Sequence, residues 1–135
     1  FLRRAFGGET DTVMRSEDGV LRHATVRIGD SLVMVSKGTE MFEPRPLALH
    51  LYVENTDAVY ERALNAGAQP LREPSDQFYG SRSAGVEDRW GNHWWVATQI
   101  EQVDETELKQ RKAEFRESES EELLHPGEAR RENDS

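Results

Sequence analysis

The chain has 135 residues, no cysteine and a formal net charge of −9, with 26 acidic residues against 17 basic ones. This length suffices for one domain with a buried core. The acidic balance disfavours nucleic acid as a partner, because phosphate binding needs clustered lysine and arginine. The lack of cysteine excludes disulfides and cysteine-ligated zinc and favours a cytoplasmic protein. No apolar run approaches the roughly 18 residues of a membrane span, so no membrane partner is expected.

The first 36 residues predict a short helix followed by three strands. Phe1 to Gly7 has the pattern of the last turns of a helix that ends at a glycine C-cap. We expect strands over 9–15, 20–28 and 31–36, separated by turns. Because this helix has no strand before it, we expect the first strand of the first unit to be absent from the sequence.

A linker over residues 37–46, with two prolines and a glycine, leads to a second unit over 47–99. The second unit opens with a clear alternating strand from Leu47 to Glu54. Every second residue is leucine or valine, whereas His50 and Tyr52 fall on the other face. One face of this strand therefore belongs to the core, and the other lines something else.

The remainder of the second unit follows the same logic. Asn55 or Thr56 is expected to cap a helix that ends at Gly67, because Asp57 lies in its first turn and its apolar residues form a stripe. In chain order we then expect a short strand over 68–72, a loop over 73–80 and a hairpin whose first strand covers 83–89.

The two hairpins share a pattern. Residues 27–36 and 89–98 each contain a basic residue, then Gly-Asp or Gly-Asn, then an apolar strand. This repetition predicts two equivalent units that pair and leave a cleft between them. We therefore expect an α+β fold of two strand-helix-strand-strand-strand units, with a cup-shaped sheet and helices outside.

The segment 100–135 differs in character, because acidic residues dominate and apolar anchors are few. We expect a solvated helix over 104–117 and disorder in roughly the last 15 residues. Residues 1–99 are therefore predicted to form one domain, followed by an acidic helix and tail.

The duplicated unit resembles the vicinal oxygen chelate superfamily, which includes glyoxalase I, the fosfomycin and bleomycin resistance proteins and the extradiol dioxygenases. The resemblance is carried by residues 50–60, by Ala66-Gly67-Ala68 and by 87–92. It extends over the second unit and more loosely over the first. Residues 76–88 resemble a subgroup described as glyoxalase-like or bleomycin-resistance-like.

The resemblance implies that enzymes of this superfamily hold a divalent metal with one ligand from the first and last strand of each unit. The corresponding positions here are Trp95, Val33 and Ala48, and the fourth is expected in the absent leader. Indole, isopropyl and methyl groups cannot ligate such a cation. We therefore expect no metal cofactor, although His50 and His93 leave a non-standard divalent metal site open.

Strand parity and the aromatic loop predict the lining of the cup. Trp95 offers stacking area, and His50 and Arg82 can orient a ligand. An inward-facing tryptophan or tyrosine can equally fill the cup as core. The residues expected to contact a ligand are His50, Tyr52, Trp95, His93, Val33, Phe78, Tyr79 and Arg82. The Phe78-Tyr79 loop either covers the cup or forms part of a dimer interface.

The first functional hypothesis is a small-molecule-binding protein without the usual metal. The alternative is a lyase, isomerase or dioxygenase that uses a displaced metal, or His50 as an acid or base. His50 has a second interpretation, as a structural histidine that is buried and donates to a carbonyl. A third hypothesis is a dimer scaffold. An unpaired sheet edge, which another chain could cover, supports this third hypothesis. The resemblance implies a homodimer in each case, because units of this superfamily pair within a chain or between chains.

Overall fold

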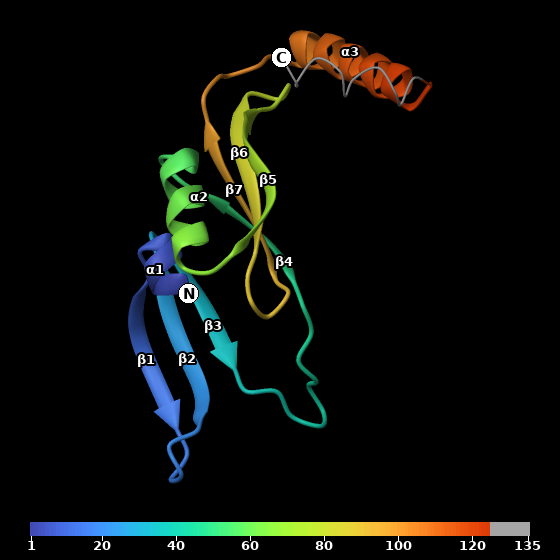
Figure 1. The fold of residues 1–135 in the computed structure, drawn as a ribbon. Helices are drawn as coiled ribbons and strands as arrows, with labels where there is room; N and C mark the ends of the chain where they lie inside the picture. The colour runs from blue at the N-terminus through green and yellow to red at the C-terminus, as the bar shows by residue number, and fades with distance from the viewer. Residues whose placement is uncertain (125–135) are drawn as a thin grey trace. The chain divides into compact units, whose positions relative to one another are not determined.

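The computed structural model describes residues 1–124 (Figure 1). Its elements, in chain order, are α1 (Leu2–Phe6), β1 (Glu9–Arg15), β2 (Leu21–Ile28), β3 (Ser31–Ser36), β4 (Ala48–Tyr52), α2 (Thr56–Asn65), β5 (Gln69–Asp76), β6 (Ser81–Glu87), β7 (His93–Gln99) and α3 (Glu105–Leu124). The predicted α+β class is confirmed. The order β4-α2-β5-β6-β7 is the expected strand-helix-strand-strand-strand unit, and α1-β1-β2-β3 has the same order without its first strand.

Two segments differ from the expected elements. The strand β5 continues to Asp76, although a loop was expected from residue 73, because β5 and β6 form one long hairpin. The helix α3 continues to Leu124, past the expected end at residue 117. The disorder predicted for the end of the chain concerns mainly residues that lie outside the described part.

The chain forms two compact units. The main unit comprises Phe1–Ser75 and Arg82–Thr98, and the C-terminal unit comprises Asp76–Ser81 with the chain from Gln99 onward.

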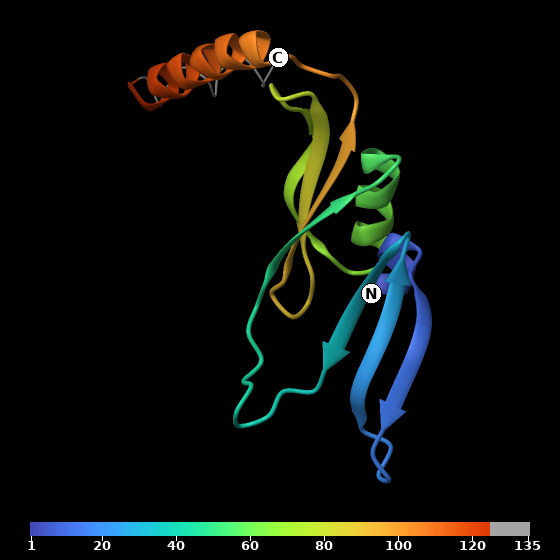
Figure 2. The ribbon, with the colours of Figure 1, turned by 180° about the vertical axis from the view of Figure 1, so that it is seen from behind.

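The strands of the main unit form two sheets, which can be followed in Figures 1 and 2. One has the order β1-β2-β3 with antiparallel neighbours, and the other has the order β4-β7-β6-β5. In the second sheet β4 runs parallel to β7, and His50 pairs with Trp95. The Gly29-Asp30 turn contains two residues, because Ile28 pairs directly with Ser31.

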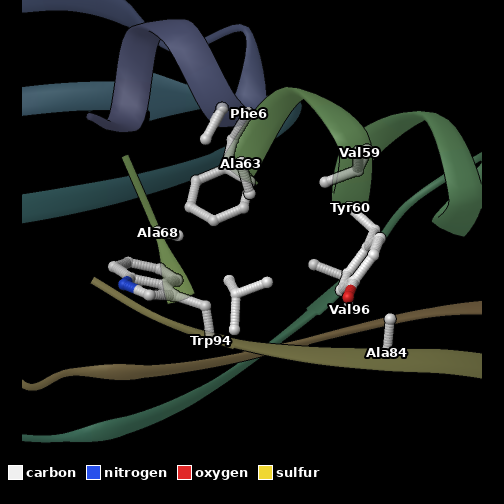
Figure 3. Close-up of a cluster of buried hydrophobic side chains, with 10 residues drawn as sticks. Phe6, Val59, Tyr60, Ala63, Ala68, Ala84, Trp94 and Val96 are labelled. Carbon is white, nitrogen blue, oxygen red and sulfur yellow. The ribbon is translucent and has the colours of Figure 1, made fainter. Parts of the chain in front are cut away.

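The core of the main unit lies where α1 and α2 pack against one face of the four-stranded sheet (Figure 3). Aromatic contact contributes strongly, since the rings of Phe6 and Trp94 are 4.9 Å apart between centroids. The labelled buried residues come from both helices, from the turn after α2 and from the sheet: Phe6, Val59, Tyr60, Ala63, Ala68, Ala84, Trp94 and Val96. The stripe of apolar residues that the sequence placed on α2 therefore faces the sheet.

The start of α2 is fixed by two polar side chains. Asn55 is the N-cap, and its side-chain oxygen accepts a hydrogen bond from the backbone N–H of Ala58 at 3.0 Å. Thr56 is buried, and its hydroxyl donates to the Arg82 carbonyl at 2.9 Å. The backbone N–H of Thr56 donates to the Thr98 hydroxyl at 3.0 Å. These bonds tie the helix to β6 and β7.

The loop between β6 and β7 is organised by the buried carboxylate of Asp88. One oxygen accepts the backbone N–H groups of Trp90 and Asn92 at 2.9 and 3.0 Å. The other accepts the Asn92 amide at 2.9 Å and the Trp94 indole N–H at 3.0 Å. Burial by itself raises the pKa of Asp88, but these hydrogen bonds outweigh it and hold the pKa below its usual range.

The C-terminal unit is held by contacts between the tip of the β5–β6 hairpin and α3. Phe78 packs on Phe115, with 5.0 Å between the ring centroids. Arg111 donates to both carboxylate oxygens of Glu101, at 2.9 and 2.7 Å, and also pairs with Glu107. Within residues 1–124, no helix is both long and apolar enough to cross a membrane.

We predict that Asp88→Asn lowers the free energy of unfolding by about 1–3 kcal/mol at pH 7, because the buried Trp94 N–H then faces an amide that cannot satisfy all four donors. Urea unfolding measures this change. The matched control is Asp11→Asn, since Asp11 is half-exposed and lies 3.8 Å from Arg27. An exposed pair of this kind contributes at most about 1 kcal/mol.

The lowered pKa of Asp88 predicts that the free energy of unfolding depends on pH. The pKa of Asp88 is lower in the folded than in the unfolded chain, so its charge stabilises the fold above the unfolded value of about 3.9. This stabilisation is lost as the pH falls through the folded pKa. The stability difference between the natural chain and Asp88→Asn should therefore shrink below about pH 4. A difference that stays constant from pH 7 to pH 3 would contradict this assignment.

Candidate functional site

The candidate site is the face of the four-stranded sheet that points away from α2, which we call the Trp95 face. Neighbouring residues of a strand point to opposite faces, so Trp94 enters the core while Trp95 points outward. On β4 the same alternation leaves Leu49 and Leu51 packed on the core. The side chains that belong to the Trp95 face are His50, Tyr52, Arg72, Ser83, Glu87, His93 and Trp95, with Gly85 below them.

Trp95 lies against the backbone of Gly85 on the neighbouring strand β6. A Cβ atom at Gly85 would come within 2.3 Å of the Trp95 Cζ3 atom and within 2.6 Å of its Cε3 atom. The indole can adopt this position only because residue 85 has no side chain. Trp95 therefore presents a half-buried aromatic surface on the sheet.

Arg72 extends this aromatic surface with a positive charge. Its guanidinium carbon lies 4.9 Å from the centroid of the Trp95 ring, and the guanidinium also donates to the hydroxyl of Ser83. Arg72 is not among the residues that the sequence predicts to contact a ligand. The strand expected over 68–72 already contained Arg72, but its contacts with Ser83 and Trp95 depend on the pairing of β5, β6 and β7.

The two histidines of this face have different surroundings. His93 Nε2 lies 3.1 Å from a carboxylate oxygen of Glu87 on the neighbouring strand. The ring of His50 lies 5.0 Å from the ring of Tyr52, and both side chains are exposed. The alternative of a buried His50 is therefore wrong. Within residues 1–124, no hydrogen-bonding partner orients the His50 imidazole for proton transfer.

Tyr52 is 79% exposed, so it does not fill a core within this chain. It stands at the end of β4, on the same face as His50 and beside Ala97 in the register of the parallel strands. The structure thus brings His50, Tyr52, His93 and Trp95 onto one accessible face, as strand parity predicted.

The donor groups on this face do not fit the metal that the resemblance implies. The expected ligand positions carry Ala48 and Trp95, and His93 already pairs with Glu87. Among the described residues, no group of three or more histidine, aspartate or glutamate side chains is arranged to hold a metal ion. A hard or borderline cation prefers several such ligands.

Val33 does not belong to the expected lining. Val33 pairs with Val26 on β2, and the side chains of directly paired residues point to the same side of a sheet. The Val26 side chain lies close to Gly8 and α1, because a Cβ atom at Gly8 would be 2.7 Å from that side chain and 3.0 Å from the Leu2 carbonyl. Val33 therefore points to the side of its sheet that carries α1. The expectation failed because the turn at Gly29 has two residues, whereas the Asp88 loop that contains Gly91 is longer. The internal repeat thus aligns the glycines but not the strand faces.

Arg82 also differs from its expected place. Its guanidinium donates to both carboxylate oxygens of Asp57, at 2.6 and 2.9 Å, in the first turn of α2. By strand parity Arg82 shares the face of Ala84 and Val86, which are buried under the helices. Its role is to join β6 to α2, and Arg72 is the arginine on the Trp95 face.

Phe78 and Tyr79 belong to the C-terminal unit. Their rings meet edge to face, with 5.2 Å between centroids, and Phe78 also packs on Phe115 of α3. Phe78 thus contributes to the apolar contact that holds this unit. A ligand contact for either residue stays a prediction.

A hollow of about 660 Å³ lies beside α1 and is lined by Phe1, Leu2, Arg3, Arg4, Gly7, Gly8, Leu21, Ala24, Val26 and Val35. None of the eight residues expected to contact a ligand lines this hollow. We favour the Trp95 face as the site, because the rings of Trp95, His50 and Tyr52 lie together there beside Arg72, whereas the hollow has Phe1 as its one aromatic ring.

The comparisons with known proteins agree with this fold. A family model described as Glyoxalase/Bleomycin resistance protein/Dioxygenase superfamily matches residues 1–96. The uncharacterized protein Mb0911c of Mycobacterium bovis is 34% identical over 103 residues, which cover 68% of this chain and 68% of the relative. Rv0887c of Mycobacterium tuberculosis is also 34% identical over 103 residues, and the match spans 61% of its length and 68% of this chain.

Two solved structures are similar as well. TioX from Micromonospora sp. ML1 is 25% identical, with a TM-score of 0.64 over 73% of this chain and 85% of TioX. TnmS3, an antibiotic binding protein from Streptomyces sp. CB03234, is 20% identical, with a TM-score of 0.58 over 73% of this chain and 81% of TnmS3. The likeness to TnmS3 shows the fold alone.

We predict that Gly85→Ala displaces the Trp95 indole, because the added methyl group would overlap the ring. The chain contains three tryptophans, so two-dimensional NMR should show three indole N–H signals. The Trp95 signal should shift strongly in this variant, whereas the Trp94 signal should move little because Asp88 holds that N–H. Unchanged positions for all three signals would show that Trp95 does not lie on Gly85.

Proposed function

The chain belongs to the Glyoxalase/Bleomycin resistance protein/Dioxygenase superfamily, and from that membership we propose that it binds a planar aromatic small molecule on the Trp95 face. The observation that carries the proposal is the convergence of Trp95, His50 and Tyr52 on one accessible sheet face. Aromatic side chains outside a core supply large contact areas for planar ligands. TnmS3, which has a similar fold, is an antibiotic binding protein, and this agrees with the binding of a small molecule.

Binding is favoured over turnover by the chemistry of the face. His50 has no partner among residues 1–124 that would orient it as an acid or base, and the donor set does not suit the metal used by enzymes of the superfamily. A protein that binds a ligand needs only contact area and a few polar groups, and this face has both. The lack of cysteine favours a cytoplasmic location for this activity.

The test uses 2-(hydroxymethyl)anthraquinone, a neutral planar probe, and isothermal titration calorimetry. We expect binding to the natural chain and a loss of affinity of roughly tenfold in Trp95→Leu, because an aromatic stacking surface is replaced by a smaller side chain. The matched control is Trp90→Leu, since Trp90 is 61% exposed in the β6–β7 loop and lies off the Trp95 face. No binding to the natural chain, or equal losses in both variants, would refute the proposal.

We further propose that two copies of the chain pair so that their sheets enclose the ligand. The strand β3 lies at the edge of its sheet, and its Leu32 and Met34 side chains are 48% and 70% exposed. The strand β4, which carries His50 and Tyr52, is likewise an edge strand. Covering an exposed sheet edge is one way in which proteins prevent unwanted pairing, and a second copy would cover these edges here.

Sedimentation equilibrium tests this pairing. We expect the natural chain to be a dimer and Met34→Glu to be a monomer, because a charge would be buried at the interface. Met41→Glu is the control, since Met41 is 82% exposed in the linker between β3 and β4. A natural chain that is monomeric at all concentrations, or a dimer that is insensitive to Met34→Glu, would contradict the arrangement.

A further inference from the structure

Arg72 is the positive group of the Trp95 face, and its charge is not neutralised there. Its guanidinium contacts the Ser83 hydroxyl and the Trp95 ring, both of which are uncharged. Among residues 1–124, no carboxylate pairs with Arg72. This contrasts with Arg82 and Arg111, whose charges are matched by carboxylates.

The carboxylates nearest to Arg72 in sequence and on the face are engaged elsewhere. Glu73 follows Arg72 in β5 and points to the other face, where burial raises the pKa of Tyr60 and the charge of Glu73 raises it further. Glu87 lies on the Trp95 face but contacts His93 at 3.1 Å. Other described arginines also have no carboxylate partner, and Arg72 differs from them by its position over the Trp95 ring on the Trp95 face.

The Arg72 guanidinium is also held in place before any ligand arrives. Ser83 accepts one of its N–H groups, and the indole of Trp95 supports its plane. A guanidinium has five N–H donors, so the group keeps several for an acceptor. Because its side chain is already ordered, less conformational entropy is lost when an anion binds than for a free surface arginine.

We propose that Arg72 selects ligands whose planar ring carries an acidic group, a carboxylate or an ionised phenol. The ring would lie on the aromatic surface of the Trp95 face, and the acidic oxygens would accept the N–H groups of Arg72 in a charge-assisted hydrogen bond. This inference rests on the proposed function, because it names the class of ligand for the same face. Through this contact, a protein with a negative net charge could bind a ligand that is also negatively charged.

The test compares two probes of nearly equal shape, anthraquinone-2-carboxylate and neutral 2-(hydroxymethyl)anthraquinone, by calorimetry at pH 7.5. The natural chain should bind the carboxylate about tenfold more tightly than the neutral probe. In Arg72→Gln, which keeps a donor for Ser83, this preference should fall below about threefold. The preference is the ratio of the two affinities within one variant, so a change that affects both probes equally does not alter it. Arg72→Lys should retain part of the preference, since the charge remains.

The chain offers a matched control in Arg89, whose guanidinium carbon lies 5.1 Å from the centroid of the Trp90 ring in the β6–β7 loop. Arg89→Gln removes the same charge from the same kind of stacking pair and should leave the tenfold preference intact. Urea unfolding of both variants checks that they fold as the natural chain does.

The outcomes separate the two proposals. If the neutral probe binds and the carboxylate binds no better, the selection of acids by Arg72 is refuted, whereas the aromatic binding face stands. If neither probe binds, both proposals fail. If Arg89→Gln abolishes the preference as fully as Arg72→Gln does, the preference reflects overall charge and the role of Arg72 is refuted.

Discussion

The hydrogen bond from the buried Trp94 indole to the Asp88 carboxylate fixes which face of β7 enters the core, and the site depends on that choice. The bond is 3.0 Å long, and the Trp94 ring packs on Phe6. A slip of β7 by one residue would place Trp95 in the core without this acceptor, at the cost of a buried unpaired N–H. Trp95 is therefore held on the outer face by the packing of its neighbour.

The same loop also sets the position of β4. The side chain of Asn92 donates to Asp88 and accepts the backbone N–H of Leu47 at 3.0 Å, and the backbone N–H of His93 donates to the Leu47 carbonyl at 2.9 Å. These bonds fix the register of two parallel strands that are far apart in sequence. His50 comes to lie beside Trp95 as a result. The hydrogen bonds of Asp88 and Asn92 therefore determine how the aromatic side chains of the Trp95 face are arranged.

Several features could be predicted from the sequence and others could not. The alternation of β4 gave the positions of His50 and Tyr52 correctly, and Asn55 was among the predicted caps of α2. Val33 was placed on the wrong face, because the two hairpins have loops of different length behind similar Gly-Asp and Gly-Asn pairs. Arg72 was overlooked although it lies within the strand expected over 68–72, because its position beside Trp95 depends on how β5, β6 and β7 pair.

The sequence by itself determined the elements whose causes lie within a few residues: the alternating strand, the capped helix, the glycine turns and the acidic C-terminal helix. It also determined the chemistry available to the Trp95 face, an aromatic surface poor in metal ligands. Only the tertiary structure decided which arginine reaches that face. Arg82 and Arg72 look alike in sequence, but the pairing of β5, β6 and β7 directs one toward Asp57 on α2 and the other toward Trp95. That outcome depends on register between distant strands, which local sequence does not encode.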